Sequence, residues 1–95
     1  MSNEIIIFGT GGHAKVIYDI LLKGGEFTPV AFISLDTTIK TYLGLPHYSQ
    51  TDFKDLNFNK GIVGIGDNWT RAQVAEFIIF EKPEFVFINT SLMIL

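Results

Sequence analysis

The architecture follows from one stretch, EIIIFGTGGHA at residues 4–14. Residues 5–8 are apolar, mostly β-branched and followed by a glycine, which is typical of a strand buried on both faces. Gly9, Gly11 and Gly12 then predict a tight turn that requires glycine and leads into a helix. The first amide groups of a helix lack partners within it and carry partial positive charge. Strand, turn and helix together therefore predict an anion site, whose usual occupant is a phosphate.

Composition limits what the chain can be. It has 95 residues, of which 47% are hydrophobic, and a net charge of −3. This length predicts a single domain, residues 1–95, with a modest core. The acidic balance argues against nucleic-acid and anionic-membrane binding, because both need a basic face. Without cysteine, and with His13 and His47 far apart in sequence, no metal site is predicted. Neither a signal peptide nor an apolar run of about 18 residues is visible, so we expect no membrane helix and a cytoplasmic location.

Strands and helices are predicted to alternate along the rest of the chain. A helix is expected at residues 13–23, with a packed face formed by Ala14, Val16, Ile17, Ile20 and Leu21 and with a glycine cap at its end. The remaining expected elements are a strand at 30–33, a loop at 34–41, an edge strand at 44–48, a short helix at 49–56 capped by Ser49 or Thr51, a strand at 61–65, a helix at 69–82 and a strand at 85–88. The fold class is therefore α/β, a small doubly wound parallel sheet of about four strands with flanking helices.

Ligands of such sheets bind at the carboxyl ends of the strands. Three loops converge there, at residues 9–13, 34–36 and 66–68. The candidate binding residues are Gly9, Thr10, Gly11, Gly12, His13, Ser34, Asp36, Gly66, Asp67 and Asn68. No set of nucleophile, base and orienting group is apparent, so no catalytic residue is predicted.

Each motif also has a structural interpretation. Residues 9–14 fit G-x-G-x-x-A in its strand–turn–helix context, but a tight turn alone could explain them. A nicotinamide site would place an acidic residue at the end of the second strand, which here ends in Ser34, two residues before Asp36. His13 either donates a hydrogen bond to a phosphate or sugar or is a partly exposed residue at the helix start. Asp67 either lines the site or only caps the second helix.

The second helix carries two further features. Its segment 77–80, FIIF, makes it apolar around most of its surface, and such a helix is buried or contacts a partner. We expect an interface with a partner chain or a second copy, formed by helix 69–82 and the apolar tail 92–95. Arg71 either reaches an anion or forms an ion pair with Glu76 or Asp67.

Four segments, IIIFGTGGHAKVIYDIL, VAFISLD, YLGLPHY and IVGIGDNWTRAQVAEF, resemble the N-terminal domain of bacterial sugar acyltransferases of the PglD/NeuD type. The resemblance covers about residues 5–91, and its most specific parts are GTGGHAK and GIGDN followed by Arg71. It implies a Rossmann-like domain. In that family this domain is joined to a left-handed β-helix of hexapeptide repeats. The family uses acetyl-CoA to acetylate an amino or hydroxyl group of an activated sugar, and its members are usually trimers.

The resemblance also implies roles for the candidate residues. The turn at 9–12 would hold the diphosphate of a nucleotide sugar, with His13 near the phosphate or sugar. Asp36 would face the base or ribose, and residues 66–68 would line the same pocket. The family commonly has Asp directly after FI of the second strand, whereas here Ser34 and Leu35 come before Asp36. Its general-base histidine and acetyl-CoA site belong to the repeats, and no hexapeptide period appears in this sequence.

We therefore expect a nucleotide-sugar-binding domain, for a UDP-sugar-like ligand, of a bacterial sugar acetyltransferase. It is expected to be truncated or stand-alone, to bind no cofactor itself and not to be catalytic alone. One alternative is a small NAD- or flavin-nucleotide-binding domain. The other is a non-binding module for oligomerisation or interaction.

Overall fold

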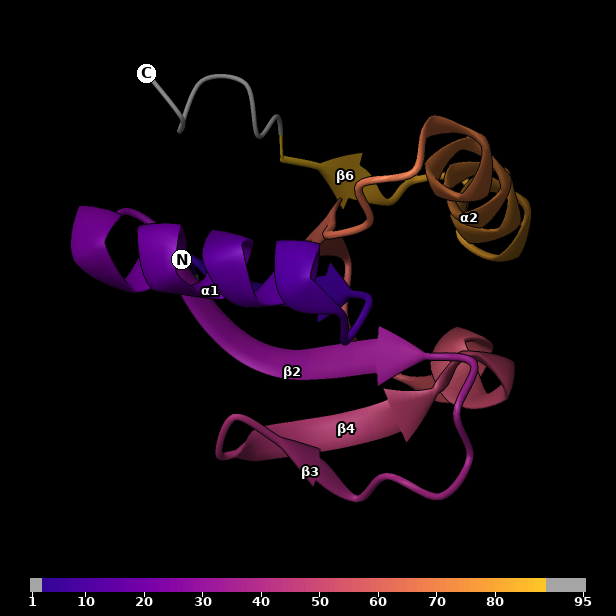
Figure 1. Ribbon diagram of the computed structural model, residues 1–95. Helices are drawn as coiled ribbons and strands as arrows, with labels where there is room; N and C mark the ends of the chain where they lie inside the picture. The colour runs from indigo at the N-terminus through magenta and orange to yellow at the C-terminus, as the bar shows by residue number, and fades with distance from the viewer. Residues whose placement is uncertain (1–2, 89–95) are drawn as a thin grey trace.

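A computed structural model describes residues 3–88 as a mixed six-stranded sheet between two layers of helix (Figure 1). The elements are β1 (Glu4–Phe8), α1 (Gly12–Gly24), β2 (Thr28–Ser34), β3 (Thr41–Tyr42), β4 (Leu45–Ser49), the 3₁₀ helix η1 (Gln50–Asp55), β5 (Lys60–Val63), α2 (Asn68–Glu81) and β6 (Val86–Phe87). The strand order is β3-β4-β2-β1-β5-β6, and every neighbouring pair is parallel except β3 and β4. The predicted α/β class is confirmed.

The sheet is larger than the four or so strands expected from the sequence. Residues 44–48 do contain a strand, but β4 is not an edge, because β3 pairs with it on the outside. Leu43 and Gly44 both have positive φ, 51° and 82°, which closes a two-residue hairpin between β3 and β4. The strand β3 thus begins at the last residue of the loop expected at 34–41. The Tyr42 ring then packs edge-on against Phe32, with 4.9 Å between the ring centroids.

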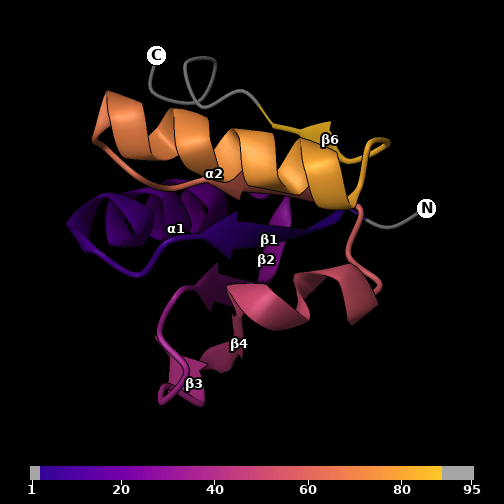
Figure 2. The same ribbon diagram turned by 90° about the vertical axis from the view of Figure 1, so that its right-hand side faces the viewer.

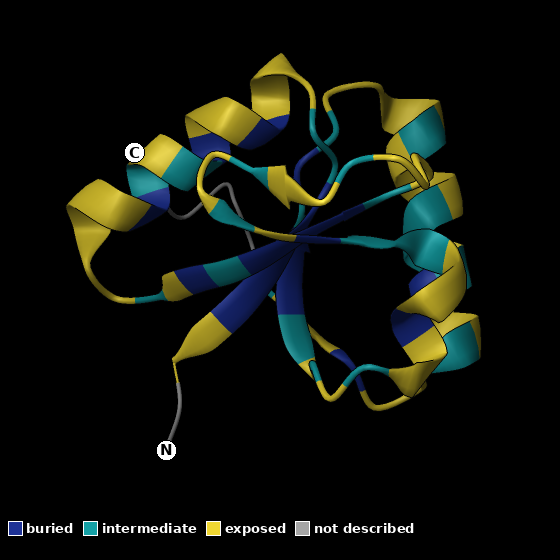
Figure 3. Cartoon of the chain, turned by 90° about the horizontal axis from the view of Figure 1, so that it is seen from below, coloured by how far each residue is buried: buried dark blue, intermediate teal, exposed yellow. Residues whose placement is uncertain are grey.

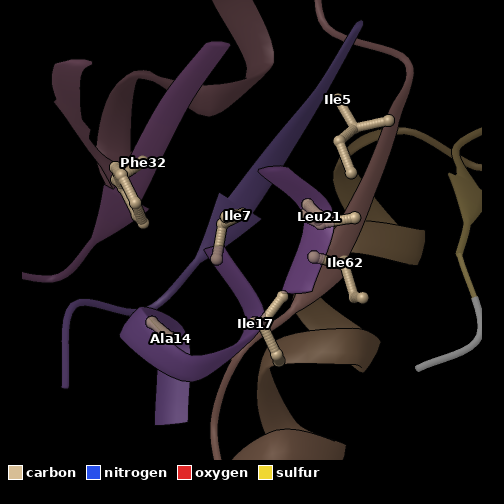
Figure 4. Packing of buried hydrophobic residues seen from close by; sticks show 7 residues of the cluster. All are labelled: Ile5, Ile7, Ala14, Ile17, Leu21, Phe32 and Ile62. Carbon is tan, nitrogen blue, oxygen red and sulfur yellow. The ribbon is translucent and has the colours of Figure 1, made fainter. Parts of the chain in front are cut away.

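Side chains along β1 alternate between two separate cores. Ile5 and Ile7 belong to the cluster under α1 that also contains Ala14, Ile17, Leu21, Phe32 and Ile62 (Figure 4). Ile6 and Phe8 belong to the cluster under η1 and α2 that also contains Ala31, Ile33, Phe53, Ile78 and Phe85. The prediction that this strand is buried on both faces is confirmed, and the two helices cover opposite faces of the sheet (Figure 2).

Helix α1 follows its predicted boundaries within one residue at each end. Ala14, Ile17 and Leu21 are buried as expected, and Gly25 caps the helix with φ 70° and an N–H donated to the Leu21 carbonyl at 3.1 Å. The assignment of Val16 to the packed face was wrong, since 54% of it is exposed. Its position, two residues after Ala14, places it about 200° around the helix, away from the buried stripe.

Helix α2 is less buried than its apolar sequence suggests. Of the FIIF segment only Ile78 is fully buried, while Ile79 is 52% and Phe80 82% exposed. Figure 3 shows that exposed residues follow the outer sides of the helices. The helix is therefore buried on one face only, and its exposed apolar side chains remain available for a partner. The predicted contribution of the tail 92–95 lies outside the described residues.

Candidate functional site

Three parallel strands end together at one edge of the sheet. Phe8 of β1 lies opposite Ile33 of β2 and Val63 of β5. Beyond the strands, the Gly9 N–H donates to the Ile33 carbonyl at 2.7 Å and the Gly64 N–H to the Phe8 carbonyl at 2.8 Å. The chain leaves β1 toward β2 on one side and later returns as β5 on the other. This reversal is the position at which doubly wound sheets bind ligands.

The first glycine turn requires glycine at only one of its positions. Gly9 has φ +119°, and a Cβ there would lie 2.7 Å from the Gly64 carbonyl oxygen. Gly11 and Gly12 have no positive φ, and a Cβ at either would meet nothing within 4 Å. The expectation that all three are conformationally required was therefore wrong. What Gly11 and Gly12 provide is open space in front of a helix end.

The N-terminus of α1 also lacks a capping side chain. Its cap residue is Gly11, which makes no side-chain cap hydrogen bond, and the first turn contains no acidic residue. The side chain of His13 is exposed at this end of the helix. Amide groups of such a first turn can bind an anion, because neither the helix nor a capping side chain uses them.

The second glycine turn packs directly against the first helix. A Cβ at Gly64 would lie 3.0 Å from the Cα of Ala14, and one at Gly66 would lie 3.6 Å from Nδ1 of His13. The two glycine turns therefore lie side by side, as their strand ends predicted. The exposed imidazole of His13 therefore lies beside the second turn.

Asp67 acts as the cap of α2. Its Oδ2 accepts hydrogen bonds from the amide of Thr70 at 2.8 Å and from the Thr70 hydroxyl at 2.7 Å. These two bonds hold the pKa of the carboxyl below its usual value. Asn68 is the first residue of the helix, and its Oδ1 accepts from the guanidinium of Arg71. The capping interpretation thus explains Asp67, and Arg71 contacts Asn68 in the same turn.

Ser34, at the end of β2, belongs to a partly buried polar chain that the sequence did not reveal. Its Oγ lies 2.7 Å from Nε2 of His47 on β4, and Nδ1 of the same imidazole lies 3.1 Å from the Ile39 carbonyl oxygen. His47 is the buried polar residue of the described core, with 6% of its surface exposed. The partners are 13 residues apart in sequence, so only the parallel pairing of β2 and β4 brings them together.

Asp36 organises the loop after β2. Its Oδ1 accepts from the Thr38 amide at 2.7 Å and from the Thr38 hydroxyl at 2.6 Å. These bonds place the pKa of the exposed carboxyl below its usual value. The Asp36 amide in turn lies 3.3 Å from Oγ of Ser34. The predicted contact of Asp36 with a base or ribose stays a prediction.

A pocket of about 260 Å³ opens between these loops and α2. It is lined by Phe8, Gly9, Thr10, Ile33, Ser34, Leu35, Gln50, Ile65, Thr70 and Val74. Three of the predicted binding residues line it, namely Gly9, Thr10 and Ser34. The others, Gly11, Gly12, His13, Asp36, Gly66, Asp67 and Asn68, lie outside the lining.

Several lining residues were missed by sequence reasoning. Leu35 directly follows Ser34, and Gln50 directly follows the end of β4, so both could have been found from strand ends alone. Thr70 and Val74 are one helical turn apart, and only the placement of α2 over this edge reveals them. The lining is apolar apart from Thr10, Ser34, Gln50 and Thr70, and it contains neither Lys nor Arg.

A second hollow, of about 320 Å³, lies beside the C-terminal end of α2. Its Lys82 ammonium donates to the carbonyls of Leu56 and Phe58 and lies 4.7 Å from the Phe53 ring centroid. Burial lowers the pKa of this amine. The ammonium thus binds the carbonyls of the loop at 56–58. The residues that line this hollow include neither a glycine turn nor a helix N-terminus.

Residues 3–88 contain neither a candidate metal site nor a candidate membrane-spanning helix. No group of three or more His, Asp or Glu side chains among them could hold a metal ion. No helix in the described part of the chain is long and apolar enough to cross a membrane.

Comparisons with known proteins agree with the sequence resemblance. The family model of the PglD N-terminal domain matches residues 4–78, well over half of the chain. A variant of perosamine N-acetyltransferase from Caulobacter crescentus, solved in complex with CoA and GDP-perosamine, is similar with 28% identity and a TM-score of 0.71. That match covers 87% of this chain and 39% of the enzyme, so the chain spans about two fifths of the enzyme's length. No curated protein sequence matches the chain.

Two further solved structures share the fold. UDP-D-quinovosamine 4-dehydrogenase from Vibrio fischeri has 21% identity and a TM-score of 0.69, over 94% of this chain and 80% of that one. The acetyltransferase domain of PglB from Neisseria gonorrhoeae, in complex with acetyl coenzyme A, has 22% identity and a TM-score of 0.64, over 86% and 41%. At these identities the likeness concerns the fold alone.

Proposed function

Since this chain belongs to the PglD N-terminal domain family, we propose that residues 1–95 are the nucleotide-sugar-binding domain of a bacterial sugar acetyltransferase. The domain binds substrate and does not transfer acetyl groups by itself. The observation that supports this most is the open N-terminus of α1 beside the pocket at the strand ends. Gly11 and Gly12 leave room for a diphosphate there, and unused helix amides supply its hydrogen bonds.

The pocket offers a matching place for the nucleoside. Its lining is mainly apolar, which suits the faces of a planar base, and it begins at Gly9 and Thr10 of the same turn. The similar perosamine N-acetyltransferase was solved with GDP-perosamine, which supports a nucleotide sugar as the ligand here. In this arrangement the diphosphate lies over Gly11 and the base extends toward Ser34.

Titration calorimetry with UDP, GDP, a UDP-sugar, NAD and acetyl-CoA tests the proposal. We expect heat of binding with a nucleoside diphosphate or its sugar, and none with NAD or acetyl-CoA. Binding of NAD instead would favour the alternative of a nicotinamide-binding domain. Absence of binding to every compound would contradict the proposal and favour an interaction module.

The Gly11→Val variant tests the position of the diphosphate. A Cβ at Gly11 meets nothing within 4 Å and the residue has no positive φ, so the fold should tolerate the change. Its side chain would fill the space assigned to phosphate, and binding should be abolished. The matched control is Gly24→Val at the far end of α1, where a Cβ also meets nothing within 4 Å. Unchanged affinity in Gly11→Val would remove the diphosphate from this turn.

A contact with another chain through α2 is a separate part of the proposal. Trp69, Ile79 and Phe80 of this helix are 70%, 52% and 82% exposed, which leaves a large apolar area in water. Light scattering of wild type and Phe80→Glu compares their molar masses. A self-associating wild type and a monomeric variant would support an α2 interface. Monomers in both would contradict self-association through this helix.

A further inference from the structure

The polar chain behind the pocket has a fixed direction. A carbonyl oxygen can only accept a hydrogen bond, so Nδ1 of His47, 3.1 Å from the Ile39 oxygen, must carry a hydrogen. In the neutral imidazole the other nitrogen, Nε2, is then an acceptor. Ser34 lies 2.7 Å from this Nε2, so its hydroxyl donates its single hydrogen to His47.

This direction determines what Ser34 can offer to a ligand. A hydroxyl oxygen has two lone pairs, and one of them accepts from the Asp36 amide at 3.3 Å. The other lone pair remains, and Ser34 lines the pocket. We propose that the Ile39–His47–Ser34 chain makes Ser34 an obligate hydrogen-bond acceptor, so that the pocket selects nucleosides by a donor group. Ser34 is the specificity-determining residue and His47 a positioning residue.

The surrounding structure keeps the chain from reversing. His47 is 6% exposed and is held between β2 and the loop at 36–39, so water does not easily replace either of its partners. Asp36 folds that loop through its two bonds to Thr38, and this places the Ile39 carbonyl at the imidazole. Nucleosides carry two kinds of donor, the ribose hydroxyls and the N–H groups of the base, and both fit an acceptor at this position.

Analogue binding measures this selection, which rests on the proposed nucleotide site. The probes are GDP and UDP, their deoxyribose forms, and two base-modified forms, IDP and N-methylated UDP. Wild type should bind the analogue that lacks the recognised donor roughly tenfold more weakly, the effect of one well-made hydrogen bond. Loss with the deoxyribose forms identifies a ribose hydroxyl as the donor, and loss with the base-modified forms identifies a base N–H.

Variants then connect the selection to the chain. Ser34→Ala should bring the affinity ratio of parent to analogue close to one, while Ser34→Thr, which keeps a hydroxyl, should restore it. His47→Phe should reduce the ratio, because the serine hydrogen becomes free to turn toward the ligand. A purely structural role would change stability and leave the ratio alone. Equal ratios in wild type and Ser34→Ala would overturn the inference.

A second measurement requires neither a ligand nor a stable variant. The ring nitrogen shifts of His47, observed by ¹⁵N NMR of the wild type, should show the hydrogen on Nδ1. A hydrogen on Nε2 would reverse the chain and overturn the inference, with the nucleotide site untouched. Failure of wild type to bind either GDP or UDP would overturn the site and the inference together.

Discussion

Single residues at the glycine turns separate what the fold needs from what a ligand needs. Gly9 is fixed by the backbone, because its φ is +119° and its neighbour is the Gly64 carbonyl. Gly11 and Gly12 are not fixed in this way, although all three glycines look alike in the sequence. Glycines that the fold does not need, beside an open helix end, agree with the proposed diphosphate site.

Gly9→Ala should destabilise the domain. The added methyl would lie 2.7 Å from the Gly64 oxygen in a backbone conformation that alanine rarely adopts. We expect a loss of about 1–3 kcal/mol in the free energy of unfolding, measured by urea denaturation. The control, Gly24→Ala, meets nothing within 4 Å and should leave stability unchanged or raise it by up to about 1 kcal/mol. Equal stability of the two variants would refute the backbone constraint at Gly9.

Asp67 should make part of the stability depend on pH. Its folded pKa lies below the unfolded value of 3.8, because Thr70 donates two hydrogen bonds to the charged carboxylate. The stabilisation is therefore present above the unfolded pKa and is lost as pH falls through the folded pKa. Melting temperatures of wild type and Asp67→Asn should differ most near neutral pH and converge as pH falls through the folded pKa, which lies below 3.8. A difference that stays constant across this range would mean that the charge contributes nothing to the cap.

Local chemistry made some residues predictable and left others hidden. The cap at Asp67 follows from a neighbour three residues away, which a sequence displays directly, whereas the need for glycine at position 9 depends partly on the Gly64 carbonyl of another strand end. The Ser34–His47 contact depends on the pairing of β2 with β4, 13 residues away. A lone histidine in a short apolar strand carries no sign of its partner until the strand order is known.

Among the elements, α2 shows how far an apolar pattern can mislead. Its boundaries were predicted to within a residue, yet the FIIF segment buries only one side chain fully. Helical periodicity separates Ile78 from Ile79 by about 100°, so adjacent identical residues have different surroundings. The sequence cannot assign one of them to the core without the direction in which the helix packs.

Adjacent isoleucines in α2 supply a matched pair for testing this packing. Ile78 is fully buried, while Ile79 is 52% exposed. Ile78→Val should lower the free energy of unfolding by about 0.5–1.5 kcal/mol, because it removes a buried methyl group. Ile79→Val makes the same chemical change at the surface, and its effect should stay within about 0.5 kcal/mol. Urea denaturation of both variants measures the contrast. A larger loss in the free energy of unfolding for Ile79→Val would mean that Ile79, and not Ile78, faces the core.

For the molecule as a whole, the alternation of strands and helices predicted the class and the edge at which the loops meet. The strand that was not predicted is β3, which has only two residues and is too short to leave a hydrophobic pattern, whereas β6 lies within the strand expected at 85–88. The hairpin between β3 and β4 turns at Leu43, and leucine is a residue type that rarely adopts a positive φ. This addition lies at one side of the sheet and leaves the central site unchanged.

The charge of the whole molecule predicts how nucleotide binding responds to salt. The chain has a net charge of −3, and the pocket lining contains no Lys or Arg. If backbone amides hold the diphosphate, added salt mainly screens repulsion between an acidic protein and an anionic ligand. Calorimetric Kd values for the nucleoside diphosphate should therefore change by less than about twofold between about 50 and 300 mM NaCl, or improve slightly.

A cationic side chain at the phosphate would reverse this result. One candidate is Arg71, which follows the second glycine turn in α2 and whose guanidinium contacts Asn68. If the affinity of wild type falls steeply with salt and that of Arg71→Ala does not, the phosphate is bound by this arginine and not by the amides of α1. Affinity that is equally flat in both proteins would leave the helix amides as the group that holds the anion. The same pair of titrations thus decides which of the two glycine turns carries the phosphate.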